Sequence, residues 1–139
     1  MTGCSGSKEP DNKTSVDYTV VENADLPEEL KKLIESKKDK VMRLTYTTKD
    51  YTYVVAGYGT RETSGYSIKV NDVYTGDNAL YIDLNLIGPA AGEAVNEVDT
   101  YPVIVLKMER REEKRLFFKN VEMYRKAYKK YCFLTKGVL

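Results

Sequence analysis

A chain of 139 residues with 22 basic and 21 acidic side chains has the size of a single domain and almost no net charge. This balance argues against a nucleic-acid-binding protein that is held by a general positive field. The chain has no histidine, which removes the commonest general base and the commonest metal ligand. It has 12 tyrosines and no tryptophan, and tyrosine is common both in strands and at recognition surfaces.

The N-terminal residues resemble the processing site of a bacterial lipoprotein. Small residues, Thr2 and Gly3, precede Cys4, which would be diacylated and become the mature N-terminus. Residues 5–15 contain no large apolar side chain and predict a solvated tether, about 35–40 Å long if extended. The sequence therefore predicts a lipoprotein-like tether over residues 1–15, lipidation of Cys4, and one domain over residues 16–139. A chance match of this short motif stays open as the alternative.

Two elements are predicted before residue 41. Residues 16–21 alternate between apolar and polar side chains, which predicts a short strand. Residues 25–38 predict a helix, with Asp25 near the N-cap, Pro27 in the first turn, early acids and late lysines. Its apolar face comprises Leu26, Leu30, Leu33 and Ile34. The lysines of residues 37–40 are interrupted by Asp39 and are typical of a solvated helix end.

From residue 41 the apolar side chains recur with a period of two, which is typical of strands. The predicted strands are residues 42–47, 51–56, 66–70, 80–86, 101–108 and 115–119, with a turn at residues 74–78. Residues 88–100 form a connection longer than most, either a functional loop or a crossover between sheets. About seven strands with short turns predict a mainly β fold, an immunoglobulin-like antiparallel β-sandwich with an N-terminal helix.

The C-terminal segment has a helical pattern after Asn120. One side carries Val121, Tyr124, Tyr128, Tyr131 and Cys132, while the basic residues project elsewhere. Two interpretations stay open: a helix that covers an open end of the sandwich, or a basic, aromatic helix that binds an anionic membrane or a partner. If Cys4 is lipidated, Cys132 is expected to be a buried thiol rather than half of a disulfide.

The sequence contains no recognisable catalytic motif. The pair Gly57 and Gly59 lacks the third glycine of a dinucleotide-binding loop and leads into a strand rather than a helix. No cysteine pair has metal-ligand spacing, and no Gly-x-Ser-x-Gly elbow is present. We therefore expect no enzymatic activity, no cofactor and no metal, although a calcium site built from loop oxygens at one end of the sandwich stays open.

Two loops are the candidate partner-binding region. Residues 57–65 contain three glycines, which suggests backbone angles or close approaches that side chains would forbid. This loop and residues 88–100 each lead into a strand that starts with a tyrosine, so we expect both at one end of the sandwich, a usual place for recognition. A purely structural role, in which Tyr66 and the glycines shape a turn, is the alternative. The candidate contacts are Tyr58, Thr60, Arg61, Glu62, Thr63, Glu93, Asn96 and Glu97, with Tyr58 and Arg61 as the expected hot spots.

Residues 54–70 and 100–105 resemble the C-terminal domain of the PrcB family of protease-complex subunits. The family carries a similar series of a glycine, a Thr-x-Gly-Gly-Tyr loop, a strand, a proline-containing loop and a Tyr-Pro-apolar strand. This chain has Thr63-Ser64-Gly65-Tyr66 in the loop, with Ser64 where the family often has a glycine. The resemblance spans about residues 51–119. It implies an exported, often lipid-anchored protein without activity of its own, which associates with an extracellular serine protease. The loop is also similar, more weakly, to that of chagasin-type protease inhibitors, which insert loops into an active-site cleft.

The sequence therefore predicts a non-catalytic, extracytoplasmic protein that is anchored to a membrane by a lipid at Cys4. Its expected partner is another protein, with a protease as the leading candidate, and no nucleic acid is expected. A ligand-binding or enzymatic surface lipoprotein is the alternative.

Overall fold

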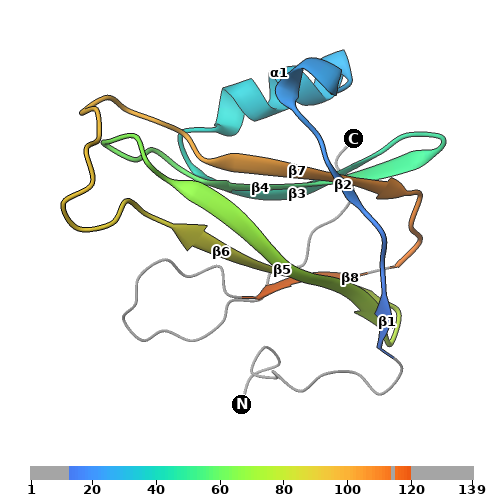
Figure 1. Cartoon of the computed structure of the whole chain (residues 1–139). Coiled ribbons are helices and arrows are strands. Elements are labelled where there is room, and N and C mark those ends of the chain that lie inside the picture. The colour runs from blue at the N-terminus through green and yellow to red at the C-terminus, as the bar shows by residue number, and fades with distance from the viewer. Residues whose placement is uncertain (1–12, 114, 120–139) are drawn as a thin grey trace.

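The computed structural model describes residues 13–113 and 115–119, which form two β-sheets packed face to face and one helix on the outer face of the second sheet (Figure 1). Sheet A contains β1 (Thr14–Ser15), β5 (Ser67–Gly76), β6 (Ala79–Ile87) and β8 (Arg115–Lys119), in the order β1-β5-β6-β8. Sheet B contains β2 (Thr19–Val20), β3 (Val41–Thr47), β4 (Tyr51–Tyr58) and β7 (Val103–Glu109), in the order β2-β7-β4-β3. The predicted mainly β fold is confirmed.

The main core lies between the two sheets. Sheet B contributes Val54, Ala56, Ile104, Leu106 and Met108, and sheet A contributes Val73, Leu80, Ile82, Leu84, Leu116 and Phe118. These side chains alternate along their strands, because successive residues of a strand point to opposite faces. The clean alternation of residues 80–86 therefore predicts the buried face of β6 correctly.

The helix α1 (Glu28–Lys37) confirms the predicted helix, which begins later than its sequence signals indicate. Asp25 lies in a preceding 3-10 turn (Asn23–Asp25), and Pro27 occupies the N-cap position without a side-chain cap. Leu26, Leu30 and Ile34 pack against the outer face of sheet B, on Met42, Leu44, Tyr53, Val55 and Val105. This second cluster explains why β4 is apolar on both faces.

The predicted strand over residues 16–21 is divided between the two sheets. β1 pairs antiparallel with β5, whereas β2 pairs antiparallel with β7. Val16 lies between them in the main core, and its N–H donates to the carbonyl of Val73 at 3.0 Å. The chain thus crosses from sheet A to sheet B here, as the blue strand in Figure 1 shows. Thr14–Ser15, which the sequence pattern assigns to the tether, belong to the folded domain.

Two further details differ from the sequence prediction. The turn predicted at residues 74–78 is a two-residue hairpin loop, in which Asp77 and Asn78 have φ angles of 53° and 64°. Asp and Asn tolerate this left-handed region better than most residues, so β5 extends to Gly76. β8 pairs parallel with β6, whereas the other named strand pairs of the described residues are antiparallel, as predicted.

The predicted tether before residue 13 and the predicted C-terminal helix, with Cys4 and Cys132, lie outside the described residues. Within the described ranges, no helix has the length and apolar character needed to cross a membrane.

Candidate functional site

The loops of residues 59–66 and 88–102 lie side by side at one end of the sandwich, which we call the loop end (Figure 1). Arg61 and Thr100 form an isolated antiparallel bridge, and the hydroxyl of Thr100 donates to the carbonyl of Thr63 at 2.8 Å. The N–H of Ser64 donates to the carbonyl of Asn96 at 3.0 Å, and the N–H of Asn96 donates to the Ser64 hydroxyl at 2.9 Å. The expectation that both loops share one end is confirmed.

Gly65 permits the two loops to approach each other. Its φ angle is +99°, which side chains rarely adopt. A Cβ atom at this position would lie 3.0 Å from Cβ of Pro89 and 3.2 Å from Cγ1 of Val95. Gly88 is also confined, because a Cβ there would lie 3.0 Å from the ring of Tyr66. Gly65 and Gly88 therefore allow the two loops to pack more closely than larger residues would permit, as the glycine content of the sequence suggests.

Tyr58 does not belong to the exposed surface of the loop end. It is the last residue of β4, and its side chain is only 2% exposed. The guanidinium of Arg43 lies 4.9 Å from its ring centroid. Burial raises the pKa of the Tyr58 hydroxyl, although the charges of Arg43 and Arg61 oppose this shift. The role of Tyr58 as a directly contacting hot spot is therefore corrected, because a buried side chain has no surface to offer a partner.

Arg61 is half-buried and holds the loop in place. Its Nη2 donates to the carbonyl of Tyr58 at 3.1 Å, and its guanidinium lies 5.6 Å from the ring centroid of Tyr66. Its backbone forms the bridge to Thr100. These contacts use the planar guanidinium inside the protein, so Arg61 supports the loop rather than projecting from it.

The other predicted contact residues divide by exposure. Thr63 is half-buried and donates to the carbonyl of Ser64, whereas the exposed residues are Thr60, Glu62, Glu93, Asn96 and Glu97. The Glu93 carboxylate accepts a hydrogen bond from the N–H of Ala90 at 2.7 Å and so also stabilises its own turn. The hydroxyl of Thr60 donates to the carbonyl of Asp39 at 3.3 Å, which joins the loop end to the segment after α1.

Residues 52–109 match the family model described as PrcB C-terminal. The resemblance to the PrcB family is thereby confirmed over this segment, which contains both loops of the loop end. The similarity to chagasin-type inhibitors stays a prediction. The comparison with curated proteins found no match, and neither did the comparison with solved structures.

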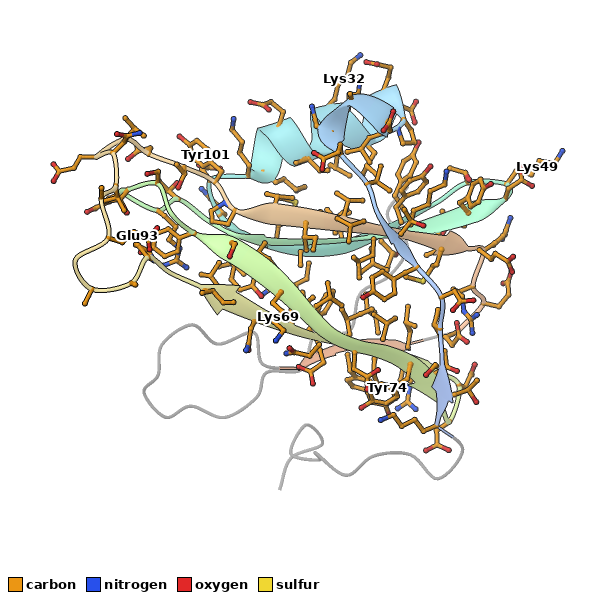
Figure 2. The ribbon with its side chains drawn as sticks, viewed as in Figure 1. Lys32, Lys49, Lys69, Tyr74, Glu93 and Tyr101 are labelled. Carbon is orange, nitrogen blue, oxygen red and sulfur yellow. The ribbon has the colours of Figure 1, made fainter. Side chains whose placement is uncertain are left out.

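Sequence reasoning missed two surface features at the loop end, the exposed side chain of Val98 and the contact of Lys38 with Tyr101. Val98 is 53% exposed between the exposed acids Glu97 and Asp99. The Nζ of Lys38 lies 4.6 Å from the ring centroid of Tyr101, and a hydrogen bond to Glu35 raises the pKa of Lys38. Figure 2 shows Tyr101 and Glu93 at this end and Lys49 at the opposite end. The sequence signal that could have identified Val98 is an apolar residue placed between two acids in a polar loop.

Sequence reasoning also missed Arg43, which precedes the segment that matches the PrcB family model. It lies between the rings of Tyr58 and Phe118, at 4.9 and 5.3 Å from their centroids. Its Nη1 donates to the carbonyls of Met42 and Gly57, both at 2.7 Å. Burial lowers the pKa of its guanidinium. Arg43 thus ties β3 to β4 and to β8 of the other sheet.

The charged side chains that the loop end exposes are acidic, and one large apolar side chain is exposed with them. Its exposed carboxylates are Glu62, Glu93, Glu97 and Asp99, with Val98 among them. Within residues 13–113 and 115–119, no group of three or more potential ligands could hold a metal ion. The loop end can therefore supply a contact surface with exposed negative charges and one exposed large apolar side chain.

Proposed function

We propose that this protein is a non-catalytic component of a protease complex and that it binds its protein partner through the loop end. The match to the PrcB C-terminal family model supports, in general terms, a protein that associates with a protease complex. Both loops of the loop end fall inside the matched segment. We propose three things together: that the protein has a protein partner, that this partner is a protease, and that the protein itself does not catalyse a reaction.

The observation that carries the proposal is the way the two loops are joined. The Arg61–Thr100 bridge and the reciprocal Ser64–Asn96 hydrogen bonds fix one loop against the other. Loops that are ordered before binding lose less conformational entropy when a partner docks, so more of the contact energy appears as affinity. The strands on either side supply the fixed scaffold on which recognition loops are usually carried.

The surface chemistry indicates the kind of partner. The two loops expose the carboxylates of Glu62, Glu93, Glu97 and Asp99, and the exposed Val98 lies between Glu97 and Asp99 in the chain. Interfaces commonly combine an apolar centre with a polar rim, and complementary charge accelerates association. We therefore expect a partner surface that carries basic residues around an apolar depression.

The proposal includes attachment to the outer face of a membrane through a lipid at Cys4. The small residues before Cys4 and the polar residues that follow it support this location. A tether between the lipid and β1 would let the domain reach a partner in the same membrane or beside it.

The test is co-purification of a protease with the tagged full-length protein from detergent-solubilised membranes of the organism that encodes it. We expect casein hydrolysis in the eluate and an identifiable protease by mass spectrometry. The double variant Glu62→Lys, Glu97→Lys should reduce the recovered protease at least tenfold, which corresponds to about 1.4 kcal/mol. The double variant Asp50→Lys, Glu112→Lys, at the opposite end, is the control for the same change in net charge.

Two results would contradict the proposal. Equal recovery of the protease with the Glu62→Lys, Glu97→Lys variant and with the Asp50→Lys, Glu112→Lys control would show that the loop end does not form the interface. Hydrolysis of casein by the recombinant protein alone, abolished by a single substitution such as Asp99→Asn, would make the protein an enzyme.

A further inference from the structure

The outer edge of sheet B is formed by β3, and its backbone geometry can be read from the strand pairing. Within the described residues β3 pairs with β4 only. The N–H of Tyr58 donates to the carbonyl of Pro102, so this residue of β4 points its backbone groups toward the β7 side. Backbone groups alternate in direction along an antiparallel strand, so Gly57, Val55 and Tyr53 point toward β3.

The same alternation fixes the direction of the β3 groups. Met42, Leu44 and Tyr46 stand opposite Gly57, Val55 and Tyr53, and therefore point their backbone groups inward to β4. The backbone groups of Val41, Arg43, Thr45 and Thr47 point to the opposite side, where no described strand lies. A strand edge of this kind is a template for one more strand.

A groove runs beside the first half of this edge. Its volume is about 580 Å³, and it is lined by the end of α1 and the start of β3, namely residues 36–37 and 39–44. Val41 is 57% exposed at this place. Because side chains of an added strand alternate between two faces, one set would enter the groove while the backbone pairs with β3.

The charges around the groove indicate the occupant. Lys37 is exposed and has no ion pair among the described residues. The side chain of Lys40 is 79% exposed and lies 3.6 Å from Asp39, the one acid of the groove lining. Lys37, Lys40 and Asp39 leave a positive balance, which favours an acidic segment. The C-terminal segment of this chain carries Arg125, Lys126, Lys129 and Lys130, so like charges oppose its binding here.

We propose that the outer edge of β3 binds an extended acidic segment of a partner protein by β-strand addition. The main-chain hydrogen bonds would come from the outward groups of β3, and the selection for acidic side chains from Lys37 and Lys40. The groove adjoins the loop end through the Thr60–Asp39 hydrogen bond, and the β3 edge runs on from there to Thr47. Thr45 and Thr47 belong to no part of the loop end, so their amides report on binding at the edge alone.

The probe for this site is an eight-residue peptide of alternating valine and glutamate with blocked ends, titrated into the isotopically labelled protein and followed by NMR. We expect chemical-shift changes along β3 and the end of α1, and slower hydrogen exchange of the Thr45 and Thr47 amides. The matched peptide with lysine in place of glutamate should bind at least tenfold more weakly.

Two variants separate backbone pairing from charge. Thr45→Pro removes an outward N–H without removing a hydrogen bond to β4, and proline is tolerated at such edge positions. It should abolish binding of the valine-glutamate peptide while the remaining amide spectrum stays folded. The double variant Lys37→Glu, Lys40→Glu should weaken binding at least tenfold even if Thr45→Pro fails to fold. The double variant Lys32→Glu, Lys69→Glu, at two exposed positions outside the groove lining, is the control for the same change in net charge (Figure 2).

Three results would overturn the proposal. Equal binding of the two peptides would remove the charge selection. Strong protection of the Thr45 and Thr47 amides before peptide is added would show that this chain already covers the edge. Concentration-dependent dimerisation that Thr45→Pro abolishes would assign the edge to a second copy of the chain.

Discussion

Arg61 and Thr100 donate their backbone N–H groups to each other's carbonyls, and both hydrogen bonds are 2.8 Å long. This pair is a bridge outside the named strands of the described residues. It connects the loop after β4 with the loop before β7 and so places their exposed residues on one surface. A change that separates these loops should therefore alter the whole loop end rather than one side chain.

Gly65→Ala and Gly92→Ala test the close approach of the loops. Both glycines have a positive φ angle, +99° and +84°, but a Cβ at Gly92 would meet nothing within 4 Å. We expect Gly92→Ala to lower the free energy of unfolding by about 1 kcal/mol through backbone strain alone. Gly65→Ala should cost more than about 2 kcal/mol, because its Cβ also meets Pro89 and Val95.

Denaturant unfolding and amide exchange measure this difference. With Gly65→Ala, the Ser64 N–H bonded to Asn96 should exchange faster, whereas with Gly92→Ala it should not. Equal losses of stability for the two variants would contradict the packing argument.

Tyr58 should be important for stability rather than for direct contact. Its side chain is 2% exposed, and no described residue hydrogen-bonds its hydroxyl. We expect Tyr58→Phe to change the free energy of unfolding by less than about 1 kcal/mol, because the ring is kept and no hydrogen bond is lost. Tyr58→Ala should cost about 3–5 kcal/mol through the cavity it leaves. A melting temperature unchanged by Tyr58→Ala would contradict the burial of this ring.

The Tyr58 hydroxyl should also make stability sensitive to alkaline pH. Burial raises its pKa in the folded state above the unfolded value of about 10. The stability that depends on neutral Tyr58 is therefore fully present below about pH 10 and is lost as the pH rises through the folded-state pKa. We expect Tyr58→Phe to lose less stability than the natural protein between about pH 9 and 11.5 in denaturant titrations. Parallel curves for the two proteins would contradict this prediction.

Cys4 should determine where the protein is found. Expressed from its full gene in its own organism, the protein should partition into the detergent phase, and Cys4→Ala should move it to the aqueous phase. Cys132→Ala is the matched control, because loss of the other cysteine should leave partition unchanged. Aqueous partition of the natural protein would contradict lipidation.

The sequence predicts the elements of this fold better than their connections. The period of two in residues 80–86 and the apolar face of residues 26–34 reflect burial against one neighbour, which local spacing records. The division of residues 16–21 between two sheets leaves no such record, because β1 and β2 continue the same alternation while their partners differ. The parallel pairing of β8 likewise depends on which sheet the chain enters after residue 109.

At the loop end, sequence reasoning placed the loops correctly but could not assign every side chain. Tyr58 and Arg61 are residue types common at hot spots, yet the strand continues to Tyr58 and directs its ring into the protein. Arg43 reads as the polar position of an alternating strand. Its guanidinium lies between two rings because β3 and β8 meet at one edge of the sandwich, a relationship between residues distant in sequence.

The crossing of the chain between β1 and β2 has a mechanical consequence. Tension applied through the N-terminal segment reaches β1 first, and β1 is held by pairing of two residues with β5. The Lys13–Asp72 ion pair, with 3.2 Å between Nζ and Oδ2, and the contact of Lys13 with the Tyr74 ring lie at the same point. A sustained pull would act first on these contacts and then on Val16, whose side chain lies in the core, before it reaches β2. The N-terminus could thus lengthen under force while the loop end keeps its shape.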